Sequence, residues 1–328
     1  MTSVTSCRRS RFGRHQRGRR VNVRATLWWM ITLACVVGVG CGTDQEQDAD
    51  PVVVEDQGPP YAPEWDGSEP LGGERAARVV LPQSYSVERR WPLVIALHGF
   101  SSSPGWVDGF LGLSAMVDDR EFIAVLPPGT VGAGNFSFWN ATDACCDFGD
   151  SGVDDAAYLS ALIDEATERL AVDPERIYFM GHSNGGFMSY RMACELSDRI
   201  RAVAVVAGSV AADPEVCQPN EPVSVLHVHG DEDEVIPYEG GALSGERFPG
   251  AEEVAARWAS LQGCEEAVAG DAIDAVLGLT GAETEVQRWQ GCQPGASVEL
   301  WSMRGAEHNP TLSTVGKRAM VDFLLEQR

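Results

Sequence analysis

Short apolar runs alternate with amphipathic stretches along residues 74–328, and this alternation constrains the fold more than any other feature. The runs are rich in β-branched residues and cover 92–97, 122–126, 176–180, 202–206 and 223–228. Buried strands of a parallel sheet have this composition. Helical periodicity predicts helices over 154–170, 254–261 and 314–325, the first opened by a capping box of Ser151 and Asp154. We therefore expect an α/β fold with a mostly parallel central sheet, helices on both faces, and functional residues at the carboxyl ends of the strands.

Residues 1–41 have the pattern of an export signal. They carry eight Arg and no acidic residue, and an apolar run covers 25–40. This run is shorter than the roughly 20 residues that span a bilayer, so it favours a leader over a membrane anchor. Gly38 and Gly40 precede Cys41, as in a bacterial lipoprotein leader whose Cys is lipidated. Simple cleavage with a soluble product is the alternative, and either way the protein is expected outside the cytoplasm.

Residues 42–73 are acidic, rich in Pro and Gly, and without periodicity. Such a composition predicts a disordered linker between the leader and a domain over 74–328. The whole chain has 48 acidic and 25 basic residues and a net charge of −23, even though the leader is basic. A body this acidic repels phosphate backbones, so nucleic-acid binding is not expected. Contact with a membrane is expected only through a lipid at Cys41.

The pentapeptide Gly181-His182-Ser183-Asn184-Gly185 lies between a predicted strand and a helical segment over 186–196. In this context G-x-S-x-G is typical of a nucleophile elbow, a tight turn that raises the Ser oxygen above the sheet. Ser183 is therefore the candidate nucleophile. The N–H of Asn184, and that of Phe100 after the strand 92–97, are candidate donors to an oxyanion.

A serine nucleophile needs a base, and His308 is the best placed of the six histidines. His308 lies in a loop after a predicted strand at 298–303 and before the last helix, whereas the other histidines lie in the leader, in the elbow, or in or beside earlier strands. The order Ser, acid, His is that of the α/β-hydrolases. The acid then belongs to the turn after 223–228, where charge alone leaves Asp231, Glu232, Asp233 and Glu234 open.

Motifs along residues 75–328 occur in an order that resembles one enzyme group, the secreted polyhydroxybutyrate depolymerases and feruloyl esterases, which are related to family-one carbohydrate esterases. These motifs are L-H-G (97–99), F-W-N (138–140), C-C (145–146), V-D-D (153–155), D-P-E-R-I-Y (173–178), G-H-S-N-G-G-F-M (181–188), H-G-D-E-D-E-V-I-P-Y (229–238) and G-A-E-H (305–308).

The resemblance implies an α/β-hydrolase fold and assigns Asp233 as the acid, because the family pattern H-G-x-x-D-x-x-V-P-Y has its Asp there. It also implies the disulfides Cys194–Cys217 and Cys264–Cys292, which leaves Cys145 and Cys146 as a vicinal pair or as free thiols. The family commonly has Trp-Pro shortly after the catalytic His, but Asn309-Pro310 follows here, so the substrate preference is open. Trp139 is a candidate for the substrate pocket or for the core.

No cofactor or metal is expected. The cysteines form no C-x-x-C pair, the acidic residues near 143–155 lack the EF-hand pattern, and no Gly-rich phosphate loop is present.

These observations predict an extracellular serine esterase that acts on polyhydroxyalkanoate or on feruloyl or acetyl esters of polysaccharide, so the expected partner is an ester substrate, polymeric or small. The alternatives are a serine peptidase of prolyl-oligopeptidase type and a non-catalytic lipoprotein with a hydrolase fold. A peptidase of that type carries a propeller domain, for which residues 42–73 are too few.

Overall fold

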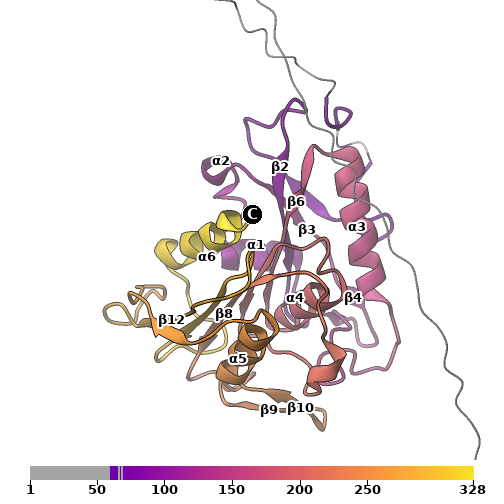
Figure 1. Cartoon of the computed structure of the whole chain (residues 1–328). Coiled ribbons are helices and arrows are strands. Elements are labelled where there is room, and N and C mark those ends of the chain that lie inside the picture. Colours follow the sequence, from indigo (N-terminus) through magenta and orange to yellow (C-terminus); the bar gives the residue numbers. More distant parts are fainter. Residues whose placement is uncertain (1–59, 66, 68) are drawn as a thin grey trace, which may run out of the picture. The chain divides into compact units, whose positions relative to one another are not determined.

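The predicted apolar runs form the centre of a nine-stranded sheet (Figure 1). Its strands are β1 (Arg78–Val80), β2 (Trp91–Leu97), β3 (Ile123–Leu126), β6 (Val172–His182), β7 (Ala202–Val206), β8 (Ser224–Gly230), β11 (Ala267–Ala269), β12 (Thr284–Trp289) and β13 (Val298–Met303). The neighbours β3, β2, β6, β7, β8 and β13 run parallel, in that order. At the two edges, β1 pairs antiparallel with β3, and β12 and β11 continue antiparallel from β13. Two hairpins, β4 (Thr130–Val131) with β5 (Ser137–Phe138) and β9 (Gly240–Leu243) with β10 (Glu246–Pro249), lie outside the sheet.

Helices cover both faces of this sheet. They are α1 (Pro104–Leu111), α2 (Val117–Arg120), α3 (Asp155–Arg169), α4 (Asn184–Glu195), α5 (Ala251–Leu261) and α6 (Thr314–Glu326), with a 3-10 turn at Pro214–Val216. Alternate side chains of β2 belong to the cores on the two opposite faces of the sheet. Leu93, Ile95 and Leu97 join the core that contains α3, α4 and α5, whereas Val94 and Ala96 join the core that contains α1, α2 and α6. The predicted α/β fold class is confirmed.

The computed structural model describes residues 60–65, 67 and 69–328. The predicted leader over 1–41, the predicted lipidation site Cys41 and most of the predicted linker lie outside the described residues. The described residues just before Glu74 pack on the domain: Leu71 is fully buried, and the Gly72 N–H donates to Glu165 Oε2 at 2.7 Å. The packed domain therefore includes Leu71 and Gly72, which the linker prediction placed outside it. That prediction rested on the average composition of the segment, and an average does not reveal a single buried Leu.

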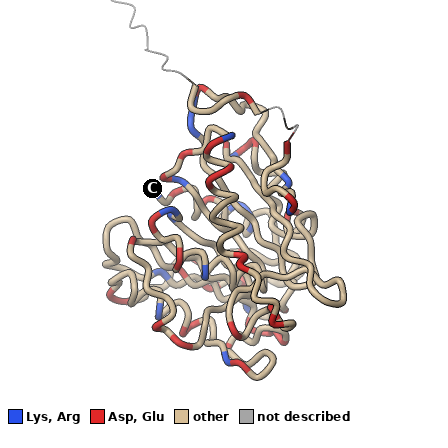
Figure 2. Tube along the Cα trace, turned by 90° about the vertical axis from the view of Figure 1, so that its right-hand side faces the viewer, with Lys and Arg blue, Asp and Glu red and all other residues tan. Residues whose placement is uncertain are grey.

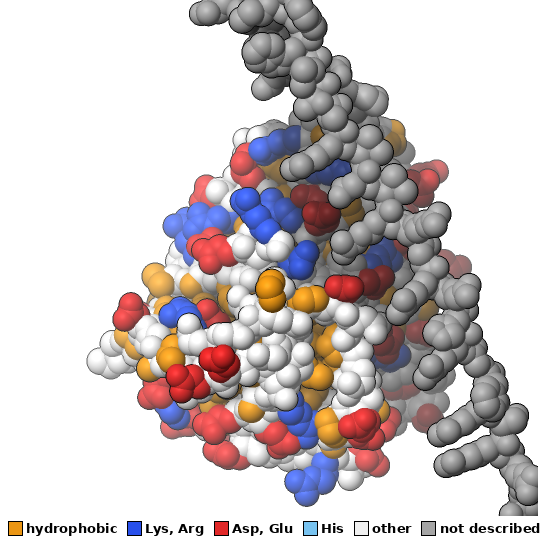
Figure 3. All heavy atoms as spheres, viewed as in Figure 1, with side chains coloured by type: hydrophobic (Ala, Val, Ile, Leu, Met, Phe, Trp, Pro, Cys, Tyr) orange, Lys and Arg blue, Asp and Glu red, His pale blue; other side chains and the backbone are white. Residues whose placement is uncertain are grey.

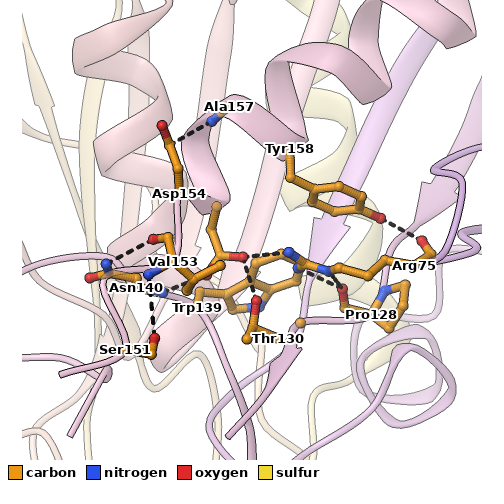
Figure 4. A network of polar contacts seen from close by, with 12 residues as sticks. Arg75, Pro128, Thr130, Trp139, Asn140, Ser151, Val153, Asp154, Ala157 and Tyr158 are labelled. Carbon is orange, nitrogen blue, oxygen red and sulfur yellow. Dashed lines mark hydrogen bonds and ion pairs between the residues drawn. The ribbon is translucent and has the colours of Figure 1, made fainter. Parts of the chain in front are cut away.

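The start of α3 differs from the predicted capping box. Asp154 is the N-cap, and its carboxylate accepts the Ala157 N–H at 2.9 Å (Figure 4). Ser151 instead accepts the Val153 N–H within the preceding turn. The chain turns sharply before the helix, with Asp150 and Gly152 at positive φ, so Ser151 is too early to cap it.

Charged side chains are unevenly distributed over the described surface. Acidic residues recur along most of the trace (Figure 2). On the face in Figure 3, acidic side chains predominate around α5, β9 and β10, while Lys and Arg gather around α2 and α6. Among the described residues, no helix is both long and apolar enough to span a bilayer.

Three disulfides join the six cysteines of the domain. The pairs are Cys145–Cys146, Cys194–Cys217 and Cys264–Cys292. The last two are the pairs that the resemblance implies, and the first is the vicinal pair that it left open. Cys194–Cys217 links the end of α4 to the segment after β7, and Cys264–Cys292 links the end of α5 to the segment after β12.

Removing either long-range disulfide should lower stability. The two bridges span 23 and 28 residues, and loops of this length stabilise a fold by about 3 kcal/mol each, because they restrict the unfolded chain. We expect Cys194→Ala/Cys217→Ala to lower Tm by roughly 10 °C in a thermal melt. Peptide mapping without reductant is the control, and finding these cysteines as free thiols would contradict the pairing.

Candidate active site

Ser183 occupies the turn between β6 and α4 by itself. Its φ and ψ are 55° and −123°, a left-handed conformation that is costly for a residue with a side chain. The flanking glycines make this turn possible: a Cβ on Gly181 would clash with the Gly185 carbonyl, and one on Gly185 would clash with the Leu97 carbonyl. The G-x-S-x-G spacing is thus a steric requirement of the turn.

The structure brings Ser183, His308 and Asp233 together at the carboxyl ends of β6, β13 and β8. Ser183 Oγ lies 3.0 Å from His308 Nε2, and His308 Nδ1 lies 2.7 Å from Asp233 Oδ2. A carboxylate only accepts, so Nδ1 carries the proton and Nε2 is free to accept from the Ser183 hydroxyl. All three residues are at least nine-tenths buried, which strengthens both hydrogen bonds.

Asp233 differs from its acidic neighbours in what it contacts. Its Oδ1 accepts the N–H groups of Val235 and Ile236, each at 2.8 Å. Burial by itself would raise the pKa of Asp233, but hydrogen bonds with His229 and His308 outweigh it and hold the pKa well below its usual range. Asp233 is therefore ionised at neutral pH.

The other acidic residues of this turn point away from His308. Asp231 accepts the Gly305 N–H at 2.6 Å and pairs with Arg304 at 3.2 Å, while Glu232 and Glu234 are exposed. The structure thus brings Asp233, and none of its acidic neighbours, to His308.

The two candidate oxyanion donors lie on adjacent segments. A Cβ on Gly99 would lie 3.3 Å from Ser183 Cβ, so the loop that carries Phe100 passes directly beside the elbow. Asn184 opens α4, where the first N–H groups of a helix have no partner within it. Its side chain is paired with Trp139: Oδ1 accepts the Trp139 N–H at 2.8 Å, and Nδ2 donates to the Trp139 carbonyl at 2.9 Å.

Trp139 is a core residue and does not line a substrate surface. Its side chain is fully buried, and its indole N–H donates to the His98 carbonyl at 3.0 Å. Of the two environments that the sequence left open for Trp139, the structure shows the core and not the substrate pocket. Because Trp139 binds both His98 and Asn184, it ties the loop of Phe100 to the start of α4.

A polar network behind Trp139 holds this loop, and the sequence analysis missed it (Figure 4). Asp155 is fully buried in α3, and its oxygens contact Arg75 Nη1 at 2.6 Å, Thr130 Oγ1 at 2.8 Å and the Asn140 N–H at 2.8 Å. The only sequence signal was the V-D-D motif, which gives no partner for the acid. Because Asn140 follows Trp139, the network anchors the same segment that supports Asn184.

Two further buried histidines adjoin the site. His182 Nε2 donates to the backbone carbonyl of His308 at 3.0 Å and so holds the loop of that residue. Burial and the nearby His308 lower the pKa of His182 to about 3. His98 Nε2 accepts the Gly129 N–H at 2.8 Å, and burial lowers its pKa as well. Both rings are therefore neutral at neutral pH.

The free energy of unfolding should fall as the pH decreases from 7 to 5. His98, His182 and His227 stay neutral in the fold because burial lowers the pKa of each. The unfolded chain binds a proton at each of them below about pH 6.5, so it holds more protons than the folded chain. Each group then reduces stability by up to about 1.4 kcal/mol per pH unit, down to its folded-state pKa. Urea titrations at pH 7, 6 and 5 measure this slope, and equal free energies at all three values would contradict it.

Exposed aromatic side chains flank the elbow, and we call Phe100, Trp106, Phe136 and Phe148 the aromatic rim. Phe100 is 37% exposed and packs against the rings of Phe136 and Phe148, at centroid distances of 5.7 and 5.3 Å. Trp106 is 41% exposed and lies 5.1 Å from the ring of His182, which is itself 4.9 Å from the ring of His308. The rim therefore offers apolar contact surface beside Ser183 and His308.

A cavity of about 480 Å³ lies elsewhere, between α4, α5 and the segment after β7. Phe187, Tyr190 and Trp258 are among its lining residues, whereas Ser183, Asp233 and His308 are not. We therefore place the candidate active site at the hydrogen-bonded residues Ser183, His308 and Asp233, and not at this cavity.

Comparisons with known proteins agree with this architecture. The family pattern described as Phospholipase/Carboxylesterase matches residues 139–256, a segment that contains Ser183 and Asp233. Feruloyl esterase B of Piromyces equi is 29% identical over 243 residues, which are 71% of this chain and 42% of that protein. Feruloyl esterase D of Neurospora crassa is 26% identical, over 75% of this chain and 78% of that protein. The match covers less than half of the length of the first of these relatives. Both relatives are named feruloyl esterases, so the resemblance to this group is confirmed.

Among solved structures, an acetyl xylan esterase from Aspergillus awamori superposes with a TM-score of 0.56. The match covers 76% of this chain and 93% of that one, at 12% sequence identity. At this identity the match shows the fold, and the fold is that of the α/β-hydrolases.

Proposed function

We propose that this chain, an α/β-hydrolase by fold, is a serine carboxylic ester hydrolase that cleaves acyl esters carried by polysaccharides. The observation that carries the proposal is the continuous hydrogen-bonded line from Ser183 through His308 to the ionised Asp233. A serine hydroxyl is a weak nucleophile by itself and becomes reactive when an oriented base accepts its proton.

In the proposed reaction, Ser183 Oγ attacks the ester carbonyl while His308 Nε2 takes its proton. Asp233 holds the imidazole in the required tautomer and stabilises the imidazolium. His308 then protonates the alcohol as it leaves, which gives an acyl-enzyme. Water attacks the acyl-enzyme by the same steps in reverse, and the free acid departs.

The oxyanion that forms in each step needs donors beside Ser183. We assign this role to the backbone N–H groups of Phe100 and Asn184, because both lie on segments in contact with the elbow. Trp139 and the Asp155 network would keep these two segments in register.

Feruloyl or acetyl groups are the acyl groups that we favour. The two relatives described above are named feruloyl esterases, and one structural neighbour is named an acetyl xylan esterase. The aromatic rim supports this class, because aromatic faces bind both a phenolic ring and the apolar face of a sugar. Polyhydroxyalkanoate is the second candidate, since an exposed aromatic surface also suits an apolar polymer.

Covalent labelling together with a substrate panel tests the proposal. A p-nitrophenyl phosphonate should add once, on the peptide that contains Ser183, as measured by mass spectrometry. The panel contains methyl ferulate, acetylated xylan, a polyhydroxybutyrate film and a prolyl p-nitroanilide. Turnover of methyl ferulate or acetylated xylan is expected. Turnover of the anilide alone would favour a peptidase, turnover of the film alone would favour a depolymerase, and neither labelling nor turnover would favour a binding protein.

Truncating the aromatic rim should weaken activity on bulky esters selectively. We expect Phe148→Ala to lower kcat/KM for methyl ferulate about fivefold to tenfold, because an aromatic contact contributes about 0.5–1.5 kcal/mol. Activity on ethyl acetate should change less than twofold, since that ester has no aromatic group to pack against Phe148. Leu277→Ala removes a side chain of similar exposure elsewhere and is the matched control. Equal losses on both substrates would count against a role in substrate binding.

We also propose that the protein acts outside the cytoplasm. Its three disulfides are typical of oxidising compartments, and the Arg-rich apolar leader is typical of exported chains. Metabolic labelling with a palmitate analogue, compared between the native chain and Cys41→Ser, separates a lipid-anchored from a freely secreted product.

A further inference from the structure

A chain of buried polar side chains runs behind Asp233, and the proposed reaction does not use it. Tyr190 Oη lies 2.8 Å from His227 Nδ1, and His227 Nε2 lies 3.1 Å from His229 Nδ1. His229 Nε2 then lies 2.7 Å from the Ile236 carbonyl and 3.3 Å from Asp233 Oδ2. Tyr190, His227 and His229 are each at most 1% exposed.

With neutral imidazole rings, the far end of the chain fixes the direction of every hydrogen bond in it. The Ile236 carbonyl only accepts, so His229 Nε2 carries a proton, and in the neutral ring Nδ1 accepts. His227 must then donate from Nε2 and accept at Nδ1, where the Tyr190 hydroxyl is the donor. Burial lowers the pKa of His227 well below its usual range, which agrees with a neutral ring there. All donors therefore point from Tyr190 toward the Ile236 carbonyl, and Asp233 Oδ2 lies 3.3 Å from the nitrogen of the last donor.

The last donor, His229 Nε2, binds the Ile236 carbonyl and also contacts the carboxylate oxygen that binds His308. Asp233 Oδ2 is 2.7 Å from His308 Nδ1 and 3.3 Å from His229 Nε2, while Oδ1 is held by two backbone N–H groups. Hydrogen bonds in a series polarise one another, so the donors behind His229 strengthen its contact with the carboxylate.

We propose that His229 is a positioning residue which, supported by His227 and Tyr190, holds the Asp233 carboxylate in place toward His308. This inference rests on the proposed function of the triad. Burying polar side chains costs free energy that an apolar cluster avoids, so this chain is a poor choice for packing alone. Its neighbours keep the rings aligned: Tyr190 stacks on Trp258 at 5.6 Å, and Tyr238 meets His229 edge-on at 5.8 Å.

Two substitutions at His229 separate positioning from packing. His229→Leu removes the donor, and we expect kcat to fall about 10- to 100-fold with KM within twofold, the effect of a lost hydrogen bond to a charged group. His229→Gln keeps a donor toward Ile236 and Asp233 and an acceptor toward His227, so it should recover kcat to within about fivefold. Tyr178→Phe is the matched control, because it removes a buried tyrosine hydroxyl that donates to the Gln327 carbonyl at 2.7 Å and has no contact with this chain, so it should lower Tm while leaving kcat unchanged.

A double-mutant cycle with Asp233 decides how His229 acts. In the Asp233→Asn background, His229→Leu should lower kcat less than twofold further, because the group it positions is already lost. A purely structural role would give the same factor in both backgrounds and would overturn the proposal. If Asp233→Asn alone leaves kcat unchanged, the proposed triad fails, which is a separate result.

If His229→Leu does not fold, Tyr190→Phe can replace it in the double-mutant cycle with Asp233→Asn. It removes only the first hydroxyl of the chain and should lower kcat about twofold to fivefold with Asp233 present, and not at all in the Asp233→Asn background. If His229→Leu does not fold, unchanged kcat for Tyr190→Phe, or the same factor in both backgrounds, would overturn the proposal.

Discussion

Ser183→Ala should lower kcat for p-nitrophenyl acetate by about 10⁴- to 10⁶-fold, the loss seen when a serine hydrolase loses its nucleophile. The hydroxyl is the group proposed to attack the ester, and its only described partner is His308 Nε2, at 3.0 Å. The elbow should keep its shape, because the turn depends on close approaches at Gly181 and Gly185 and not on the Ser183 oxygen. Initial-rate kinetics and a thermal melt measure the two effects separately.

Ser197→Ala is the matched control for this experiment. Ser197 is buried like Ser183 and accepts the Asn220 N–H at 2.9 Å, but it lies beyond the far end of α4. We expect it to change kcat less than twofold and to lower Tm slightly. Turnover of Ser183→Ala at the native rate would refute the nucleophile assignment.

Asp233→Asn should lower kcat by about 10⁴-fold, as the equivalent change does in the serine protease triad. An Asn amide facing His308 Nδ1 can donate to it, which favours the tautomer with the proton on Nε2. That tautomer cannot accept a proton from Ser183. The substitution keeps the volume of the side chain, so circular dichroism should match that of the native protein.

Asp231→Asn is the control two residues away. Its carboxylate accepts the Gly305 N–H and pairs with Arg304, and it does not reach His308. An Asn oxygen can still accept from Gly305, so the loss in kcat should be less than about tenfold. A larger loss for Asp231→Asn than for Asp233→Asn would move the acid to Asp231, and small losses for both would remove this turn from the mechanism.

The sequence by itself determined the architecture and two of the three candidate catalytic residues. Apolar runs with β-branched residues and helices of period 3.6 are local patterns, and each predicted run is a strand of the observed sheet. The elbow could also be predicted from a short sequence motif. Any side chain at Gly181 or Gly185 would clash with the same short turn or with the strand beside it, so both positions must be glycine. His308 followed by elimination, since few histidines occur in the chain.

The choice among Asp231, Glu232, Asp233 and Glu234 needed the tertiary structure. All four lie in one acidic turn, and neither charge nor spacing distinguishes them; only the resemblance selected Asp233. In the structure the direction of the backbone after β8 decides, because it turns Asp233 toward His308 and the N–H groups of Val235 and Ile236, and Asp231 toward Gly305.

The contacts of three other residues also could not be predicted from the sequence: Trp139, Asp155 and His229. A Trp in a loop, an Asp at a helix start and a His in a strand each fit several environments, and their partners here are 41, 80 and 7 residues away along the chain. The sequence pattern reports which segments are apolar or periodic, since those properties depend on neighbouring residues. Which polar atoms meet depends on how the segments pack, and so only the folded chain assigned these residues their contacts.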